Sequence, residues 1–451
     1  MQRVQRVQRV GIGVVTTVMV VSSLLMSGGA PGADAAPRAR EVVARANVPL
    51  SYRPAPGLLF NEPYGRGGRS PSTIRRHVLR SIDSTRRGDV VQMAAWNVRG
   101  RSWARAIIRA HRRGVAVQVI MDRSNWSREH PNPDAAAVAK VLKGRENRPV
   151  QSWLKRCAGS CRGARGIPHS KFFLFSRVTD RAYVTMFGSN NATDVAAEDQ
   201  WNDLYTWVGN KTIYDTFQGI FNEMSLDRSQ GARGYRAARF SPTQGVAFYP
   251  YRGAIPSAVG DPDLARLNQI RCTGATGGTG AGGHTQIRIM QTAIHGERGK
   301  TLARKLVRLR KAGCDIRVVY ALMGNDVYKI LGAGHVAKLQ LAYDRDRNGV
   351  YDIYLHLKSL AISGVYQGRT DARVVYNGSA NWSAVPLASD EVVGEFRDPA
   401  MTNAYLRWTD FLFTHRPGGW GPVNLAPVRA ASVEGRVVPV DPYALMKAEG
   451  L

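Results

Sequence analysis

The sequence contains an internal repeat, and this repeat restricts the possible folds more than any other feature. The stretch GLLFNEPYG at 57–65 returns as GVAFYPYRG at 245–253, and the stretch 100–122 returns at 299–323. In the longer pair, small, basic and aliphatic residues occupy corresponding positions. A repeat of this length indicates that one supersecondary unit occurs twice. We therefore predict that the chain folds as two related halves.

Each copy shows the same order of helix and strand signals. In the first copy a helical stretch at 74–87 precedes a strand-like stretch at 90–98. A second helix follows in both copies and ends at Gly114 or Gly313, where glycine suits a left-handed C-cap. A β-rich run comes next in both copies. Alternating strands and helices predict an α/β fold in which each half is a sheet flanked by helices.

Both copies also carry a polar motif at the ends of two apolar strands. The HxK motif lies at the start of the first strand of a predicted hairpin, and the GSxN motif lies at the end of the second strand. The motif residues are His169, Lys171, Gly188, Ser189 and Asn191 in the first copy, and His356, Lys358, Gly378, Ser379 and Asn381 in the second. Because alternate side chains of a strand share a face, each half should project an imidazole and an ammonium group together. Docking of the halves would bring both sets into one cavity.

These residue types suit the chemistry of a phosphodiester. A neutral imidazole can attack phosphorus and form a phosphohistidine, while a protonated imidazole gives a proton to the leaving alcohol. Lysine and asparagine can stabilise the non-bridging oxygens without a metal. A carboxylate behind each histidine would fix its tautomer. Asp203 and Glu391, which follow the two motif asparagines by about ten to twelve residues, are the candidates.

The paired segments resemble the HKD motifs of the phospholipase D superfamily, and the resemblance covers nearly the whole chain after the first forty residues. It implies two pseudo-repeated α-β-α sandwich halves that form one unit with a single active site and need no cofactor. It also implies His169 as the nucleophile and His356 as the acid, with the lysines and asparagines of both motifs as further catalytic residues. Ser189 and Ser379 are expected to bind substrate.

The chain departs from the family pattern at one position of each motif. Where the family has an aspartate, this sequence has Ser176 in the first copy and Ser363 in the second. The resemblance assigns that aspartate a structural role, so the departure leaves the chemistry intact. It does leave the subfamily and the substrate open.

The formal net charge of +29 indicates an anionic partner. The preferred function is a secreted, monomeric phospholipase D that acts on phospholipid at a membrane or vesicle surface, by hydrolysis or by transfer of the phosphatidyl group. The alternative is a secreted, metal-independent endonuclease, which the charge favours although no nucleic-acid module is recognisable. A non-catalytic binder of anionic polymers is the third reading, but such a protein has no need of two His–Lys pairs.

The first 36 residues are expected to be a secretory signal peptide. Three arginines precede an uncharged apolar run, and small residues follow it. A membrane anchor is the alternative, although the run is short for a span. Beyond the signal, we expect the first half at 37–240, the second half at 241–425 and a C-terminal tail at 426–451.

The four cysteines are expected to form two disulfides, because an exported chain meets oxidising conditions. Of the three possible connectivities we prefer Cys157 with Cys161 and Cys272 with Cys314. A zinc site at CAGSC is the less favoured alternative, since a second pair of ligands is missing nearby.

Two loops carry weaker signals. The stretch 344–352 has the first part of a calcium-loop pattern, and a polar hairpin turn explains the same residues. The glycine-rich stretch 272–284 reads as a flexible loop, with a lid over the cleft as the alternative.

Overall fold

The computed structural model describes residues 49–146, 148–251, 260–343 and 351–417, and two paired strands, β22 (Ala431–Val433) and β23 (Arg436–Val438). By internal contacts the chain divides into residues 1–46 and 47–451, and every described residue belongs to the second unit. The expected signal peptide and most of the expected calcium loop therefore lie outside the described residues. Within the described part, no helix combines the length and apolar character that a membrane span requires.

The first half of the described chain is built on a seven-stranded sheet. Its strands in spatial order are β1 (Gly57–Phe60), β10 (Asp203–Trp207), β7 (Arg181–Gly188), β6 (Phe172–Val178), β2 (Val90–Ala94), β4 (Ala116–Asp122) and β5 (Trp153–Cys157). The strands β2, β4 and β5 are parallel, and the others pair antiparallel.

The second half is built on a second sheet with the same strand order. Its path is β11 (Arg236–Ser241), β12 (Gln244–Phe248), β21 (Val392–Phe396), β20 (Arg369–Gly378), β19 (Lys358–Tyr366), β14 (Gln286–Ile294), β15 (Asp315–Met323) and β16 (Ala337–Gln340), with β13 (Ile270–Arg271) paired to β19. From β12 to β16 each strand has its counterpart between β1 and β5. The predicted repeat is therefore present in the topology.

Two strands of the second sheet, β11 and β13, have no counterpart in the first sheet. The strand β11 pairs antiparallel with β12 at the edge of the second sheet. The boundary expected at residue 240 falls inside β11, so the second sheet begins a few residues earlier than the sequence suggests.

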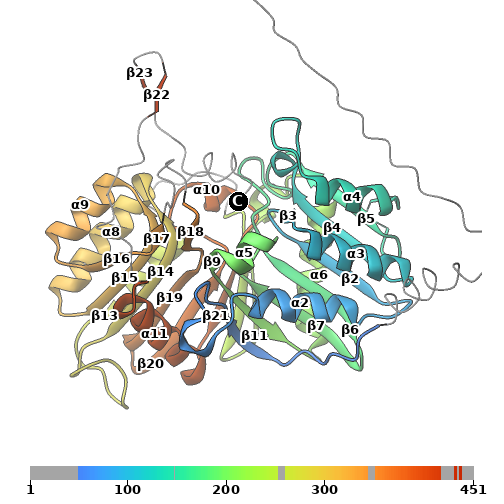
Figure 1. Cartoon of the computed structure of the whole chain (residues 1–451). Coiled ribbons are helices and arrows are strands. Elements are labelled where there is room, and N and C mark those ends of the chain that lie inside the picture. Colours follow the sequence, from blue (N-terminus) through green and yellow to red (C-terminus); the bar gives the residue numbers. More distant parts are fainter. Residues whose placement is uncertain are drawn as a thin grey trace, which may run out of the picture. The chain divides into compact units, whose positions relative to one another are not determined.

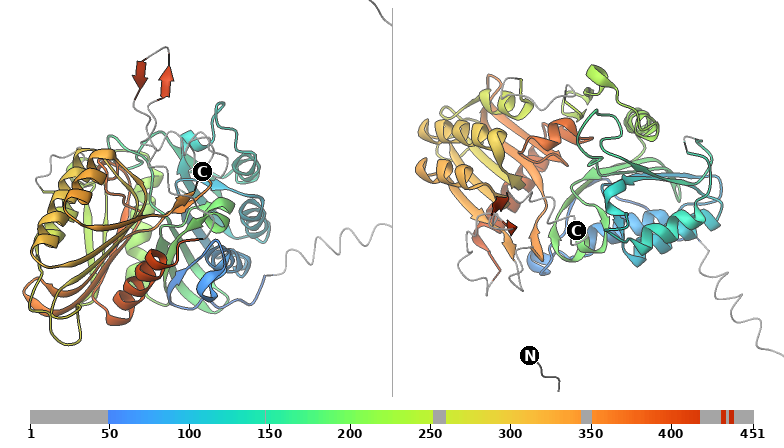
Figure 2. Two further views of the ribbon diagram at one scale, coloured as in Figure 1. Left: turned by 60° about the vertical axis from the view of Figure 1, so that its left-hand side comes forward. Right: turned by 90° about the horizontal axis from the view of Figure 1, so that it is seen from above.

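Helices cover both faces of each sheet. The helices of the first half are α2 (Thr73–Asp83), α3 (Arg101–Arg112), α4 (Pro133–Val141), α5 (Asp194–Glu198) and α6 (Lys211–Ser225); those of the second are α7 (Pro262–Asn268), α8 (Gly296–Lys311), α9 (Asn325–Ala333), α10 (Val385–Ala388) and α11 (Pro399–Thr414). Short 3-10 turns are η1 (Arg66–Gly68), η2 (Arg123–Asn125) and η3 (Gly231–Arg233). In Figure 1, α2, α3 and α4 lie outside one sheet while α8 and α9 lie outside the other. Figure 2 shows the same two helical layers from other directions.

Strand alternation divides the apolar side chains between an outer and an inner core. In β6, Phe173 and Phe175 join the core beneath the outer helices of the first half, while Phe172 and Leu174 point the other way. The inner core is continuous across both halves. Both faces of β6 are therefore apolar, as expected for a sheet covered on two sides.

Aromatic stacking joins the two halves in this inner core. Phe187 of β7 stacks on Trp207 of β10 with ring centroids 5.1 Å apart, and Trp207 stacks on Phe396 of the second sheet at 5.7 Å. Such pairs stabilise by about 0.5–1.5 kcal/mol each beyond the burial of their area. The two halves thus share one core and form one structural unit.

Two small sheets complete the structure near the junction. The strand β9 (Gln200–Trp201) of the first half pairs with β18 (Ile353–Leu355) of the second, and β18 pairs with β17 (Ala342–Tyr343). The strands β3 (Val98–Arg99) and β8 (Ala192–Thr193) form the other small sheet. Pairing of β9 with β18 fixes the segment that leads directly into His356.

The cysteines pair as predicted. Cys157 is joined to Cys161, and Cys272 is joined to Cys314. Among the described residues, one group of possible metal ligands is close enough to share an ion, and it consists of Cys157, Cys161 and Asp227. Its two sulfurs are bonded to each other, so they are not available as thiolate ligands.

The glycine-rich stretch 272–284 is held against the second sheet at several points. The disulfide of Cys272 anchors its start, and the backbone N–H of Gly280 donates to the Ser363 hydroxyl at 3.1 Å. The Thr276 N–H donates to the carbonyl of Thr370, beside the turn between β19 and β20. This turn is at the end of β19 opposite His356, so the position of the stretch does not suit a lid over the two motifs.

Candidate active site

The two HxK motifs lie at equivalent positions, immediately before β6 and at the start of β19. Phe172 of β6 is paired with Ala94, the last residue of β2, and Lys358 is paired with Gln291 near the end of β14. Both motifs are therefore at the carboxyl ends of parallel strands. Ligands of open α/β sheets bind at this edge.

The two lysines are buried and are held in the same way. Lys171 Nζ donates to the carbonyl oxygen of His169 at 2.5 Å, and Lys358 Nζ donates to the carbonyl oxygen of His356 at 2.6 Å. Burial lowers the pKa of Lys171 to about 7, against the opposing effect of the Glu391 charge. Burial also lowers the pKa of Lys358 far below its usual value, and the charge of Lys171 lowers it further. The lysines of the two halves thus lie within electrostatic range of each other.

His169 is backed by a carboxylate from the other half of the chain. Its Nδ1 lies 2.9 Å from Glu391 Oε1 and 3.0 Å from Oε2. With Nδ1 protonated toward Glu391, Nε2 carries the ring lone pair that can act as a nucleophile. Burial raises the pKa of Glu391 to about 7, while Lys171 and a hydrogen bond from Ser379 act in the opposite sense. The carboxylate predicted from the sequence is therefore in place behind His169.

His356 is backed by an amide. Its Nδ1 lies 2.8 Å from Asn202 Oδ1. The orientation of this amide is set by its nitrogen, since Asn202 Nδ2 donates to the carbonyl oxygen of Ala196 at 2.9 Å. Burial lowers the pKa of His356 well below its usual value, and the positive charges of Lys358 and Lys171 lower it further. The contact of His356 with Asn202, like that of His169 with Glu391, joins the two halves, so the two motifs meet.

The structure corrects the expectation for Asp203. Its carboxylate accepts from the Tyr405 hydroxyl at 2.5 Å and from Asn377 Nδ2 at 3.2 Å, and Ser189 N donates to its other oxygen at 2.8 Å. Burial raises the pKa of Asp203. The carboxylate thus fixes the junction of β7 with α11, and its neighbour Asn202 occupies the position behind the histidine.

Strand pairing shows that Asn202 and Glu391 are equivalent positions of the repeat. Leu204 is paired with Gly188 in the first sheet, and Val393 is paired with Gly378 in the second. Each backing residue lies two positions before these paired residues. The repeat therefore places a carboxylate behind one histidine and a neutral amide behind the other.

The motif serines lie behind the site instead of facing a substrate. The Ser189 hydroxyl donates to Asn202 Oδ1 at 2.9 Å, and the Ser379 hydroxyl donates to Glu391 Oε2. Both serines are 0% exposed. Their hydroxyl protons are used to orient the two backing residues, which differs from the substrate-binding role expected for them.

The motif glycines allow the close strand contact that this arrangement needs. A Cβ atom on Gly188 would lie 2.3 Å from the carbonyl oxygen of Asp203, and one on Gly378 would lie 2.1 Å from that of Val392. Gly378 also has a φ of 145°, which favours glycine. A larger residue would push away the strands that follow Asn202 and Glu391.

Both motif asparagines are buried, and Asn381 contacts a buried ion-pair group. Asn381 Oδ1 accepts from Ala293 N at 3.3 Å, and its carbonyl oxygen accepts from Arg298 at 2.7 Å. Arg298 is in turn paired with Asp261 and Asp263. Asn191 is 2% exposed, and its carbonyl oxygen accepts from Asn190 Nδ2 at 2.7 Å.

Ser176 and Ser363, at the positions of the family's aspartate, have structural partners. The Ser176 hydroxyl accepts from Val90 N at 2.8 Å, and the Ser363 hydroxyl accepts from Gly280 N. A hydroxyl thus satisfies a backbone donor in each half. Neither serine belongs to the group of side chains around the histidines.

Sequence reasoning missed Asn202 and Trp96. The Trp96 ring packs edge-on against His169 with centroids 6.2 Å apart. For Asn202, the available signal was the repeat itself, but the connection from GSxN to the backing residue is one residue longer in the first copy. A one-residue shift along a strand exchanges the two faces, so spacing alone could not separate Asn202 from Asp203.

Changing Asn202→Asp should raise the pKa of His356, because a carboxylate next to Nδ1 favours the imidazolium form. A shift of about one to three units is expected for an opposite charge at this distance. Histidine NMR titration measures it without a substrate, with the His356 signal assigned from its loss in His356→Ala. The control is Asn210→Asp, which adds the same charge at the N-cap of α6. An unchanged titration of His356 in Asn202→Asp would contradict the hydrogen bond.

Comparison with known proteins identifies relatives of this architecture. The family described as "Cardiolipin synthase, PLD-like domain" matches residues 78–225. The solved structure of phosphatidylserine synthase from Haemophilus influenzae is similar with a TM-score of 0.50 at 13% sequence identity, covering 82% of this chain and 89% of that one. A comparison with curated proteins gives no match.

Two further solved structures are similar at lower TM-scores. Polyphosphate kinase from Porphyromonas gingivalis has a TM-score of 0.46 and 11% identity over 92% of this chain, which spans only 56% of that protein's length. Nuc, a phospholipase D family member from Salmonella typhimurium, has a TM-score of 0.28 and 20% identity over 38% of this chain and 94% of that one.

Proposed function

We propose that this chain, which belongs to the phospholipase D superfamily, is a phosphodiesterase that works in two steps through a phosphohistidine at His169. The observation that carries the proposal is the unequal backing of the two histidines. Glu391 lies behind His169, and Asn202 lies behind His356. A carboxylate stabilises a positively charged imidazole better than a neutral amide does, so His169 is suited to be the nucleophile and His356 to be the proton donor.

In the first step, Nε2 of His169 attacks phosphorus as the bond from phosphorus to the leaving oxygen breaks. The imidazole gains positive charge when its nitrogen bonds to phosphorus, and the Glu391 carboxylate stabilises that charge. His356 gives its Nε2 proton to the leaving oxygen. The leaving alcohol departs neutral, and the phosphoryl group stays on His169.

In the second step, water or another alcohol attacks the phosphohistidine. His356, now neutral, accepts the proton of the attacking molecule, and the P–N bond breaks to restore His169. The low pKa of His356 makes its protonated form a strong acid. A bound phosphodiester adds negative charge and raises that pKa, so the proton arrives together with the substrate.

The buried lysines supply the electrostatic part of catalysis. Burial lowers the pKa of Lys171 and of Lys358, and a bound phosphodiester would favour their charged forms, which would then stabilise the non-bridging oxygens. Asn191 and Asn381 complete the polar lining from the opposite strand ends. Because these donors are already in place, little reorganisation accompanies the reaction.

The substrate we favour is a phospholipid. The matching family is described by the name of cardiolipin synthase, and the net charge of +29 favours anionic surfaces. The enzyme would act as a monomeric phospholipase D at a membrane or vesicle surface and could transfer the phosphatidyl group to an alcohol. The two disulfides support secretion, since such bonds persist in oxidising compartments.

A secreted endonuclease is the second candidate. The same positive charge favours it, because lysine and arginine contacts to phosphates provide most of the affinity for nucleic acid. The chemistry at His169 would be unchanged, and only the groups attached to phosphorus would differ.

One assay separates the two substrates. The purified chain is given phosphatidylcholine vesicles or plasmid DNA, each with EDTA, and His169→Ala serves as the control. Choline release that disappears in the variant supports the phospholipase. DNA nicking that disappears in the variant, without choline release, would replace it by the endonuclease.

A further inference from the structure

The segment between β5 and His169, residues 158–168, reaches from the first sheet to the second half of the chain. We call it the strap. At its end, Ile167 and His169 bracket Asp390: the Asp390 N–H donates to the Ile167 carbonyl and the His169 N–H donates to the Asp390 carbonyl, each at 3.0 Å. The next residue, Glu391, is the one that backs His169. The strap therefore leads directly into the nucleophile, and it contacts Asp390, the residue next to Glu391.

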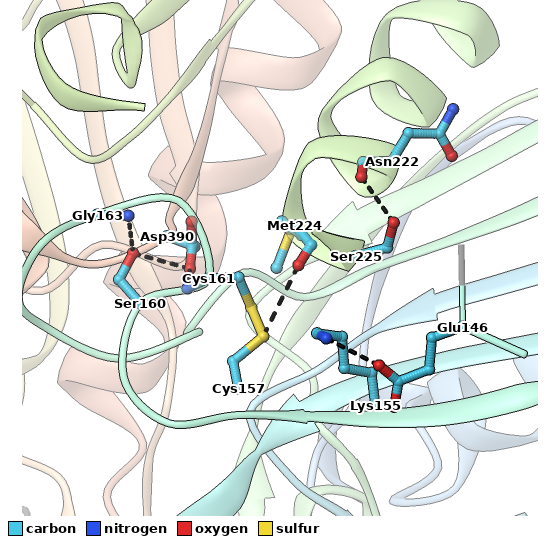
Figure 3. Close-up of a disulfide and its surroundings, with 10 residues drawn as sticks. All are labelled: Glu146, Lys155, Cys157, Ser160, Cys161, Gly163, Asn222, Met224, Ser225 and Asp390. Atoms are coloured by element: carbon cyan, nitrogen blue, oxygen red, sulfur yellow. Dashed lines mark hydrogen bonds and ion pairs between the residues drawn. A yellow bond between two sulfur atoms is a disulfide. The ribbon is translucent and has the colours of Figure 1, made fainter. Parts of the chain in front are cut away.

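The start of the strap is hydrogen-bonded to the side chain of Asp390. The Ser160 hydroxyl and the Cys161 backbone N–H both donate to Asp390 Oδ2, at 2.9 and 2.6 Å, as Figure 3 shows. Ser160 is oriented in turn by Gly163 N, which donates to its hydroxyl at 2.8 Å. Both donors come from the small loop that the Cys157–Cys161 disulfide closes. The disulfide thus holds the two donors at the spacing that one carboxylate oxygen can accept.

Buried charge fixes the strap on its other side. Arg162 is 0% exposed, and it donates to Glu223 of α6 at 2.9 Å, to the carbonyl of Tyr249 at 2.9 Å and to that of Gly234 at 2.7 Å. Tyr249 N donates to the carbonyl of Glu391 at 3.0 Å. The strap and the segment with Glu391 are thus tied to the same neighbours.

Asp390 is an unusual residue to bury at this place. Burial raises its pKa to about 7, and the charge of Arg162 and the hydrogen bonds from Ser160 and Cys161 act against that rise. Both side-chain donors are on Oδ2, whereas Oδ1 is buried without a hydrogen-bond partner among the described residues, so the carboxyl group depends on these two contacts. The two donors to its side chain come from the loop that the Cys157–Cys161 disulfide closes, so we expect the contact to depend on that disulfide.

We propose that the loop closed by the Cys157–Cys161 disulfide positions Glu391 against His169 by holding Asp390, so that opening this disulfide lowers turnover without unfolding the chain. The inference rests on the proposed function, in which the His169–Glu391 pair does the chemistry. A dithiol reductant would open the loop: the dithiol is oxidised to its own disulfide, and Cys157 and Cys161 each gain a hydrogen. Asp390 acts through its neighbour and is a positioning residue.

The second disulfide provides a matched control. Cys272–Cys314 spans 42 positions of sequence, whereas Cys157–Cys161 spans 4. A disulfide that closes a longer loop restricts the unfolded chain more. Removing Cys272–Cys314 should therefore lower Tm more than removing Cys157–Cys161, while activity should respond in the opposite order.

The experiment compares Cys157→Ser/Cys161→Ser with Cys272→Ser/Cys314→Ser, and Asp390→Ala with Asp390→Asn. We expect kcat to fall about 10- to 100-fold in Cys157→Ser/Cys161→Ser and in Asp390→Ala, with KM within about two-fold, as for a misplaced catalytic pair. Asp390→Asn keeps an acceptor for Ser160 and Cys161 and should retain most of the activity. Equal activity in the two cysteine variants, or equal loss in both Asp390 variants, would overturn the proposal.

A second readout separates this inference from the proposed function. The Nδ1 proton of His169, hydrogen-bonded to Glu391, is observable by NMR without a substrate. We expect its resonance to shift or broaden in Cys157→Ser/Cys161→Ser and to stay unchanged in the Cys272→Ser/Cys314→Ser control. If the wild type proves inactive on every phosphodiester, this resonance still tests the positioning role, and an unperturbed signal would contradict it. Ser160→Ala, which leaves both disulfides in place, serves if a cysteine variant does not fold.

Discussion

Replacing His169 by alanine is expected to abolish turnover, with kcat lowered by about 10⁴-fold or more while the fold is retained. Removal of a nucleophile that forms the covalent intermediate leaves only binding and electrostatic effects. His356→Ala should be equally inactive on a substrate whose leaving group is a simple alcohol, because the departing oxygen then lacks its proton donor. Circular dichroism and Tm would show that both variants are folded.

The leaving group distinguishes the two histidines. A nitrophenol-type leaving group departs without a proton, so His356→Ala should regain much of the first step on such a substrate. His169→Ala should gain nothing, since its nucleophile is missing. His415→Ala, an exposed histidine outside both motifs, is the control and should behave as wild type. Rescue of His169→Ala by the activated substrate, with His356→Ala unrescued, would reverse the assignment of roles.

Glu391→Gln is expected to lower kcat by about 10²- to 10⁴-fold, the range of general acid–base effects. The amide oxygen can still accept from His169 Nδ1, so the orientation is kept. The negative charge that stabilises the positive imidazole is lost. Glu395→Gln, in the strand β21 that follows Glu391, removes a carboxylate that pairs with Arg239 and Arg397, and it should change kcat less than about two-fold. A similar loss in both variants would mean that Glu391 acts only through folding.

Glu391→Gln should also change the pH dependence of kcat. Burial raises the pKa of Glu391 to about 7, so its carboxylate is protonated below that pH and charged above it. Wild-type kcat should therefore fall as pH decreases through about 7. Glu391→Gln has no such group, and its low kcat should lack this acid limb. An identical acid limb in both proteins would assign the limb to another residue.

The fold and most of the candidate site follow from the repeat. The apolar strands, the glycine-ended helices and the duplicated HxK and GSxN segments each predict local structure, and the two copies support each other. The strand β11 could not be predicted in this way, because it has no partner in the other copy. The prediction that Asp203 lies behind one of the histidines was wrong. Chemistry favoured Asp203, whereas the strand face selects Asn202.

The roles of Ser189 and Ser379 also depended on information that sequence does not contain. A serine beside a catalytic asparagine can face a substrate or a second layer, and strand pairing decides between them. Both hydroxyls turn toward the backing residues, where they complete the hydrogen bonds of buried polar groups. The strap could not be foreseen either, because its contact with Asp390 joins residues about 230 positions apart in the sequence.

Trapping the covalent intermediate tests the central claim most directly. His356→Ala, mixed with a phosphatidyl substrate that has a nitrophenol leaving group, should release the phenol in a burst and then stall, because the second step lacks its base. Rapid quenching at alkaline pH and mass spectrometry of the peptide that contains His169 should then show a phosphatidyl adduct on that residue. A burst with no adduct on His169, or with the adduct on another residue, would contradict the account.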